Sequence, residues 1–133
     1  MRGIRYAGAL PFRLKDSRPE FLLITTRRTQ RWIVPKGHWN RRQRAYEAAR
    51  QEAYEEAGLE GVIATQPIGI YEHPSHKRPQ VTPILIFPMH VTYRHGIWPE
   101  WNQRQSRWLP SPSAERLVQG NLRDIIRKFC ARW

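Results

Sequence analysis

Short apolar runs separated by turn-forming residues dominate the first third of the chain. Segments 4–14 and 21–26 have the composition and length of strands, and residues 16–19 between them form a turn. Residues 32–34 are strand formers, and the proline and glycine of segment 35–37 then break the pattern. The pattern predicts three strands followed by a glycine loop.

Three further strands are predicted in the second half of the chain. Segment 62–71 has strand composition, with Pro67 marking an edge or a bulge. Segment 83–93 is a long strand interrupted by Pro88, and residues 106–109 form a short one. Strands therefore make up most of the predicted secondary structure.

One helix is predicted in the middle of the chain. It begins near Ala45, carries alanines at helical spacing and has Gly58 placed as a C-terminal cap. Glu52, Glu55 and Glu56 stand at i, i+3 and i+4, so all three carboxylates crowd one face of this helix. The spaced alanines are Ala48, Ala49, Ala53 and Ala57.

Two polar residues near the end of the chain are placed to start helices. Ser113 precedes the helical segment 114–118, and Asn121 precedes the segment 122–131. The sequence contains no repeats, no low-complexity segment and no interdomain linker. With 133 residues, the chain is expected to form a single domain over residues 1–133.

The crowded glutamates need a physical reason, because like charges at this spacing repel by roughly 0.2–0.5 kcal/mol per pair. A solvated acidic face is one interpretation. However, the chain has only 11 acidic residues, and five of them fall within residues 47–60. Carboxylate clusters suit hard cations such as Mg²⁺, which also bridge to phosphates. A metal site is the favoured interpretation.

The segment from residue 32 to residue 61 resembles the Nudix box. The box pattern is Gly, five residues, Glu, seven residues, then Arg-Glu-apolar-any-Glu-Glu-any-Gly-apolar. Gln43 stands where the first Glu belongs and Gln51 where the Arg belongs, so each departure replaces a charge by a neutral amide. In the family, the box Arg is expected to help hold the carboxylates in place. The matching residues are Gly37, Glu52, Ala53, Glu55, Glu56, Gly58 and Leu59.

The resemblance implies an α+β fold, a Nudix-type α/β/α sandwich with a mixed β-sheet. The box helix is expected on one side of the sheet and a C-terminal helix on the other. Outside the box, the chain is similar to the diphosphoinositol polyphosphate phosphohydrolase branch and its bacterial relatives. That finer likeness rests on residues 31–37, on Arg5, on the pair Lys77 and Arg78, and on a late stretch. The late stretch contains Trp98, Pro99, Glu100, Arg104 and Trp108.

The resemblance also implies a function, the metal-dependent hydrolysis of a pyrophosphate linkage in a polyphosphorylated small molecule such as a diphosphoinositol polyphosphate. Glu52 and Glu56 are expected to bind Mg²⁺, with Mn²⁺ as the alternative. Glu55 is expected to bind a second cation through water or to act as general base, so Glu55 and Glu56 are the catalytic candidates. Backbone oxygens near Gly37 complete the metal site. The predicted substrate-binding cations are Arg5, Arg27, Lys36, Lys77, Arg78 and Arg104.

The net charge of +12 supports an anionic ligand. Only four of the 23 basic residues are lysines, and arginine grips phosphate with a planar fork. The single cysteine, Cys130, fits a reducing compartment. No apolar run approaches ~20 residues, which excludes a membrane span and favours a cytoplasmic protein. The sequence leaves the oligomeric state open.

Two alternatives use the same sequence features. A dinucleoside polyphosphate or another nucleotide substrate would need the same metal site and differ in the pocket for the nucleobase. A non-hydrolytic Nudix-like module that binds RNA or a phosphate ligand would explain Gln43 and Gln51, but a dead site has no need for three repelling glutamates. Nucleic acid is therefore the less favoured partner.

Histidines and tryptophans supply weaker candidates. His73 and His76 lie in a proline-flanked loop and are expected to be solvated rather than to bind zinc, with contact to phosphate as the alternative. Trp39 and Trp101, in polar segments, are the candidates for stacking on a nucleobase.

Overall fold

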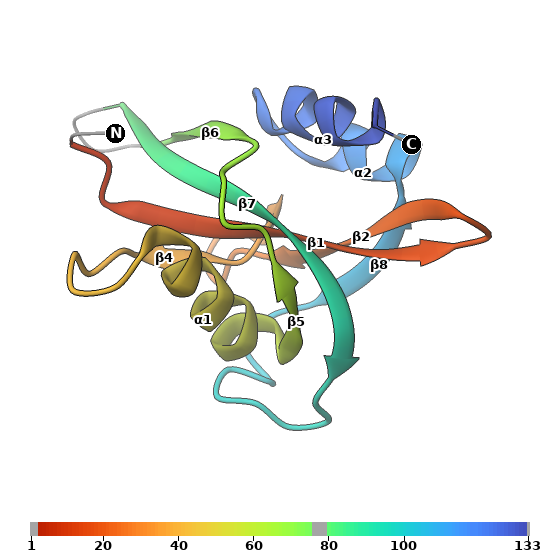
Figure 1. The fold of residues 1–133 in the computed structure, drawn as a ribbon, viewed down its shortest axis with the longest axis horizontal. Coiled ribbons are helices and arrows are strands. Elements are labelled where there is room, and N and C mark those ends of the chain that lie inside the picture. Colours follow the sequence, from red (N-terminus) through yellow and green to blue (C-terminus); the bar gives the residue numbers. More distant parts are fainter. Residues whose placement is uncertain (1–2, 76–79, 133) are drawn as a thin grey trace.

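The computed structural model describes residues 3–75 and 80–132, and within them eight strands form one mixed sheet (Figure 1). The strand order is β3-β2-β1-β7-β5; in addition β4 pairs with β1, β6 with β7, and β8 with β2. β1 and β7 are parallel, and the other pairs are antiparallel. The strands are β1 (Tyr6–Lys15), β2 (Arg18–Thr25), β3 (Trp32–Ile33), β4 (Lys36–His38), β5 (Leu59–Ile63), β6 (Gly69–Pro74), β7 (Val81–Arg94) and β8 (Ser106–Pro110).

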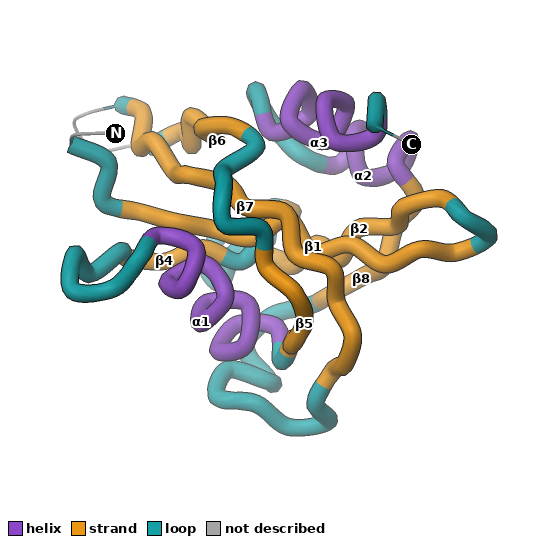
Figure 2. Tube along the Cα trace, viewed as in Figure 1, coloured by secondary structure: helices purple, strands orange, loops and turns teal. Residues whose placement is uncertain are grey.

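Three helices cover the sheet from two sides. Helix α1 (Ala45–Ala57) lies against one face, and α2 (Ser111–Leu117) and α3 (Leu122–Cys130) lie on the other (Figures 1 and 2). This arrangement confirms the predicted α/β/α sandwich, with the box helix and the C-terminal helix on opposite sides.

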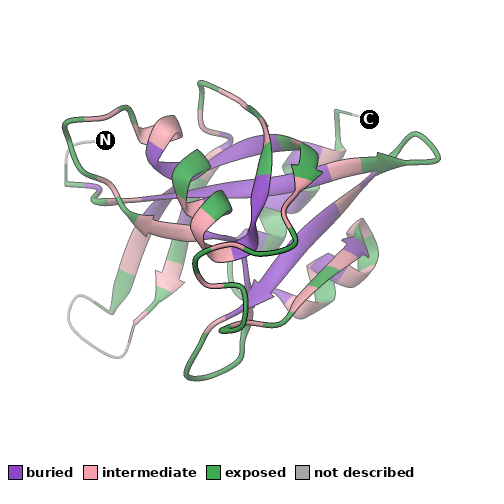
Figure 3. Ribbon diagram, turned by 90° about the horizontal axis from the view of Figure 1, so that it is seen from below, coloured by how far each residue is buried: buried purple, intermediate pink, exposed green. Residues whose placement is uncertain are grey.

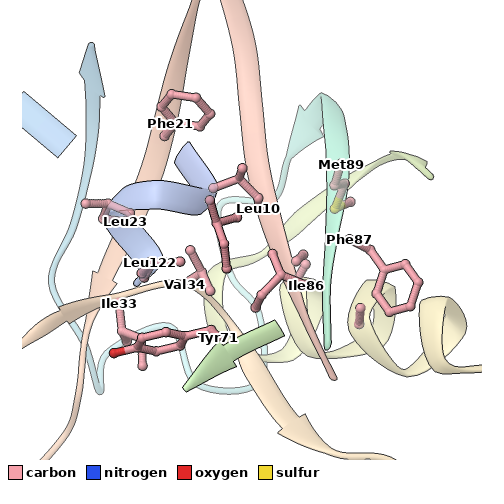
Figure 4. Packing of buried hydrophobic residues seen from close by; sticks show 14 of the residues in the cluster. Leu10, Phe21, Leu23, Ile33, Val34, Tyr71, Ile86, Phe87, Met89 and Leu122 are labelled. Carbon is pink, nitrogen blue, oxygen red and sulfur yellow. The ribbon is translucent and has the colours of Figure 1, made fainter. Parts of the chain in front are cut away.

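The core lies along the central strands β1, β2 and β7, which are buried between the two helical layers (Figure 3). Strands covered on both faces carry continuous apolar runs rather than alternating ones, as the apolar segments of the sequence do. Figure 4 shows Leu10 of β1 and Phe21 of β2 in one cluster with Leu122 of α3. Complete burial of such a side chain contributes about 2 kcal/mol.

The strand predicted over residues 62–71 is wrong in its extent, because it is two strands. β5 ends at Ile63 and β6 begins at Gly69. β5 also starts earlier than predicted and contains a bulge at Gly61, where a Cβ atom would come within 2.0 Å of the His90 carbonyl oxygen. A local irregularity of this kind is set by the neighbouring strand, so the apolar run alone did not reveal it.

Two breaks predicted at proline and glycine are strands in the structure. Gly37 lies in β4, opposite Ala7, rather than in a loop. β7 continues through Pro88, which lies where the adjacent strand changes from β5 to β6. The missing N–H of Pro88 therefore leaves no ladder hydrogen bond unmade, and its carbonyl accepts from the Ala64 N–H at 2.8 Å.

Of the two predicted helix starts, the one at Asn121 is confirmed in position and the one at Ser113 is wrong. Ser113 lies inside α2, which begins after Pro110. Asn121 precedes α3, but its side chain bonds the backbone of β6 instead of the helix. Its amide donates to the Ile70 carbonyl at 2.7 Å and accepts from the Glu72 N–H at 2.8 Å. Asn121 therefore fixes α3 to the sheet.

Candidate active site

Helix α1 begins and ends where local chemistry favours a helix boundary. The Glu47 carboxylate accepts from the Arg44 N–H at 2.9 Å, which satisfies a donor that the first helical turn leaves free. The buried face consists of the four spaced alanines, whose small side chains let the helix approach β1 closely. Gly58 ends the helix with φ +70°, the left-handed conformation that favours glycine.

The segment between β7 and β8 is fastened to the C-terminal end of α1. The Trp98 ring fills the space beside Gly58, where a Cβ atom would meet it at 2.4 Å, and its indole N–H donates to the Glu56 carbonyl at 3.3 Å. The Arg94 guanidinium lies 4.8 Å from the Trp98 ring centre and donates to the Ala57 carbonyl at 3.0 Å. These contacts position the residues that follow Trp98 beside the helix glutamates.

Glu100 joins the three helix glutamates as a fourth carboxylate. Its backbone N–H donates to the Glu55 carbonyl at 3.1 Å, and its side chain raises the pKa of both Glu52 and Glu56 by like charge. The prediction of site residues omitted Glu100. The signal that could have found it was the stretch from Trp98 to Arg104, which contributed to the family resemblance.

Glu52 occupies the most repulsive position of this cluster. Burial raises the pKa of its carboxyl to about 7, and the charges of Glu56, Glu55 and Glu100 and a hydrogen bond with Glu55 add to the shift. The carboxylate lies against Gly37 of β4, where a Cβ atom would come within 2.2 Å of its Cδ atom. Only glycine leaves this space, which explains the glycine of the box pattern.

Glu56 is held from two directions. One carboxylate oxygen accepts from the Lys36 N–H at 3.0 Å, and the other lies 3.3 Å from Nη2 of Arg104. Burial raises the pKa of Glu56, and the positive charge of Arg104 is the largest effect acting against that shift. Arg104 also reaches Glu100 at 3.1 Å and donates to the Thr25 carbonyl at 3.1 Å, so it connects the helix to β2.

A cavity of about 290 Å³ opens beside Glu56, and five of its lining side chains are cationic. Of the predicted substrate-binding residues, Arg27, Lys36 and Arg104 line it. Arg5 is exposed and does not line it, and Lys77 and Arg78 lie outside the described residues. Burial lowers the pKa of the Lys36 ammonium, although Glu56 and Glu52 oppose that shift. Arg28 and Arg31 line the same cavity and were not predicted, and His73, which also lines it, was predicted to contact phosphate only as an alternative.

A family model for the NUDIX domain matches residues 5–129 of the chain. The chain belongs to the Nudix family. Nudix hydrolase 21, chloroplastic, of Arabidopsis thaliana is 30% identical over 130 residues, which cover 94% of this chain and 65% of that protein. Nudix hydrolase 17, mitochondrial, of the same plant is 34% identical over 109 residues, covering 77% of this chain and 59% of that protein.

Solved structures show the same fold at low sequence identity. A C. elegans Ap4A hydrolase in a binary complex superposes with a TM-score of 0.69 at 20% identity, covering 97% of this chain and 96% of that one. The NUDIX domain of Shewanella oneidensis NrtR, complexed with ADP ribose, gives a TM-score of 0.74 at 11% identity, covering 99% and 89%. These comparisons confirm the predicted family and fold, and they do not single out the diphosphoinositol branch.

The Nudix box residues fit a divalent cation by the chemistry of their donors. The carboxylates of Glu52, Glu55, Glu56 and Glu100 are all oxygen ligands of the kind that Mg²⁺ prefers. The raised pKa of Glu52 marks a negative charge that its surroundings do not balance, and a cation would balance it. Within residues 3–75 and 80–132, no three acidic, histidine or cysteine side chains already stand in metal-binding positions.

The two departures from the Nudix box lie away from this cluster. Gln43 and Gln51 both line a larger concave surface, of about 720 Å³, on the side of α1 that faces Glu60 and His95. None of the four clustered carboxylates lines this surface. The smaller cavity is the one in which a box glutamate, Glu56, lies among cationic side chains.

Other candidates from the sequence have structural roles. The Arg41 guanidinium lies 3.8 Å from the Trp39 ring centre, and the Trp39 indole N–H donates to the Gln43 carbonyl at 2.9 Å. The Trp39 ring therefore already stacks with Arg41 and donates a hydrogen bond within the protein, whereas Trp101 is 53% exposed. His73 is half-buried rather than solvated, and His76 lies outside the described residues. The longest helix of the described part has 13 residues, and none there is long and apolar enough to cross a membrane.

Proposed function

We propose that this chain is a metal-dependent hydrolase that cleaves a pyrophosphate linkage in a polyphosphorylated small molecule. One observation carries the proposal: a cluster of four carboxylates borders, at Glu56, a cavity lined by Arg27, Lys36 and Arg104. Such a site offers oxygen ligands to a cation and, next to them, positive charges to phosphate. The Nudix relatives that the chain matches over most of its length carry the name hydrolase.

In this proposal Glu52 and Glu56 would hold Mg²⁺, or Mn²⁺ in its place, and a backbone oxygen near Gly37 would be available as a further ligand. When bound, such a cation would supply polarisation of a phosphoryl oxygen and a lower pKa for a water molecule. Glu55 accepts the proton of that water or holds a second cation through water. Arg27 and Lys36 orient the phosphates through charge-assisted hydrogen bonds.

The proposed substrate is a diphosphoinositol polyphosphate. The density of cations supports it, since five cationic side chains line a cavity of about 290 Å³ and suit a compact ligand with many phosphates. The alternative is a dinucleoside polyphosphate, which shares the pyrophosphate linkage. The Ap4A hydrolase among the similar structures favours this alternative only through its fold. The cytoplasmic location and the single domain expected from the sequence stay predictions.

A substrate panel tests the proposal. Phosphate release is measured from diphosphoinositol polyphosphates, dinucleoside polyphosphates and nucleoside triphosphates with Mg²⁺ and with Mn²⁺, using the Glu52→Gln variant as control. We expect metal-dependent turnover of the inositol compounds that the variant lacks. Faster turnover of dinucleoside polyphosphates would show that these, and not diphosphoinositol polyphosphates, are the substrate class. No metal-dependent turnover of any compound, together with RNA binding, would favour the non-hydrolytic module.

A further inference from the structure

Arg104 is the cation that is most closely bound to the carboxylate cluster. Its guanidinium lies 3.3 Å from Glu56 and 3.1 Å from Glu100, and it donates to the Thr25 carbonyl at 3.1 Å. The side chains of Arg104 and Glu56 are 10% and 11% exposed, so water screens their ion pair only weakly. Its geometry is that of an internal counter-charge rather than of a surface ion pair.

The helix itself supplies no cation to this cluster. Gln51 occupies the box position where an arginine is expected, and it lines the cavity on the other side of α1. Lys36 contacts Glu56 through its backbone N–H. Arg104, from the segment between β7 and β8, is the charged side chain that forms an ion pair with Glu56 in the described part of the chain.

Arg104 faces the same carboxylates that an entering divalent cation would bind. Of the two oxygens of Glu56, Oε1 already accepts the Lys36 N–H, and Oε2 is the one that faces Arg104. Glu100 Oε1 is likewise turned to Arg104. A cation that binds Glu56 therefore competes directly with the guanidinium.

We propose that Arg104 is an exchangeable counter-cation: it balances Glu56 and Glu100 until a divalent cation binds, and then turns to the substrate phosphates. The inference rests on the proposed function, because it assigns an order of binding to the same site. Arg104 lines both the cavity beside Glu56 and an adjoining one of about 190 Å³, so its released guanidinium already borders the space for phosphate. Metal binding thus creates an anion-binding group, and metal and substrate bind cooperatively.

The first arm of the test measures Mn²⁺ affinity without any substrate, from the electron paramagnetic resonance signal of free Mn²⁺ at physiological salt. Removing the competing charge in Arg104→Met should tighten Mn²⁺ binding about tenfold, in line with one charge at short range in a poorly screened site. Arg28→Met removes an equal charge from the lining of the same cavity and should change the affinity less than about twofold. Arg104→Gln replaces Arg104→Met if the latter does not fold.

The second arm measures the affinity for methylenediphosphonate, a non-hydrolysable pyrophosphate mimic, by calorimetry. With saturating Mn²⁺, Arg104→Met should bind it about tenfold more weakly than the unchanged protein, whereas without metal the two should bind it equally. An unchanged Mn²⁺ affinity, or an equal loss of anion affinity with and without metal, would overturn the exchange. If the unchanged protein binds no Mn²⁺ and hydrolyses nothing, the proposed function fails instead.

Discussion

The carboxylate of Glu52 lies where a side chain on Gly37 would have to be. A Cβ atom built on Gly37 comes within 2.2 Å of Cδ and within 2.3 Å of Oε1 of Glu52. The contact joins β4 to the third turn of α1 across the gap that the box pattern spans. The glycine and the glutamate of the box therefore constrain each other in space as well as in sequence.

The first prediction concerns this contact. Gly37→Ala should displace the Glu52 carboxylate, which is the flexible end of a side chain, so the change should alter the free energy of unfolding by no more than about 1 kcal/mol. Turnover should fall about a hundredfold, since a shift of an ångström at a reacting site has effects of this size. Gly96→Ala, where nothing lies within 4 Å of the added atom, is the control for both measurements. Equal turnover in the two variants would exclude a role for the contact.

Some elements of this site could be predicted from the sequence and others could not. The spacing of Glu52, Glu55 and Glu56 on a helix with an alanine face predicted α1 and its carboxylates correctly, because both depend on local periodicity. Glu100 and its contact with Glu55 depend on Trp98 packing against Gly58, a long-range contact that no local pattern encodes.

The same distinction explains the errors. Asn121 has the chemistry of a helix cap, yet β6 lies close enough to take both of its side-chain hydrogen bonds. Pro88 has the chemistry of a strand break, yet it falls where one neighbouring strand replaces another. In both cases an element distant in the sequence, and not the local preference of the residue, determines the structure.

The second prediction concerns the cluster itself. Glu52→Gln removes a proposed metal ligand and should lower turnover at saturating Mg²⁺ more than about a hundredfold. Mutating a residue that only hydrogen-bonds a metal ligand already lowers metal affinity or activity about 10- to 100-fold. The fold should persist, since the substitution also removes repulsion by Glu55 and Glu56. Thermal unfolding without added metal checks the fold. A variant with near-normal turnover would refute the assignment of Glu52 as a ligand.

The third prediction tests the two box departures as a pair. Gln51→Arg alone should change the free energy of unfolding little, because position 43 offers the new arginine no carboxylate. The carboxylate of Glu47, one turn before position 51, already accepts the Arg44 N–H. The double variant, with Gln43→Glu and Gln51→Arg, should gain more unfolding free energy than the sum of the two single changes, because both positions line the same concave surface. A double-mutant cycle on the free energy of unfolding should give a coupling above about 0.5 kcal/mol. Strict additivity would show that the two side chains do not interact.

The fourth prediction is a pH dependence of stability that comes from His73. Burial, together with the positive charges of Lys36 and Arg31, lowers the pKa of its imidazole to about 4, whereas in the unfolded chain it lies near 6.5. Above pH 6.5 both states are neutral and no stability is lost. As the pH falls from 6.5 toward 4 the unfolded state binds a proton that the folded state does not, so stability decreases.

Urea unfolding between pH 4.5 and 7.5 measures this effect. His73→Gln removes the titrating group, so the variant should lose less stability over this interval than the unchanged protein. The difference between the two proteins should be constant above pH 7 and change steadily below pH 6.5. Parallel curves over the whole interval would show that His73 is not protected from protonation.

The last prediction asks which arginines bind the substrate. Arg27 lines the cavity beside Glu56, where its guanidinium donates to the Gln103 side chain at 2.9 Å. Arg127 of α3 lies on the opposite side of the sheet, and its Nε is 2.6 Å from the Glu115 carboxylate. Removing Arg27 should cost a charge-assisted contact to phosphate, whereas removing Arg127 should cost its ion pairs with Glu115 and Asp124 and no such contact.

Kinetics with a diphosphoinositol polyphosphate separate the two arginines. Arg27→Ala should raise KM about tenfold or more, the effect of one such hydrogen bond to a charged group, while Arg127→Ala should leave KM within about twofold. Both variants remove one positive charge, so a general dependence on net charge would affect them equally. If Arg127→Ala raises KM as much as Arg27→Ala does, the basic surface acts as a whole and the cavity beside Glu56 does not select the substrate.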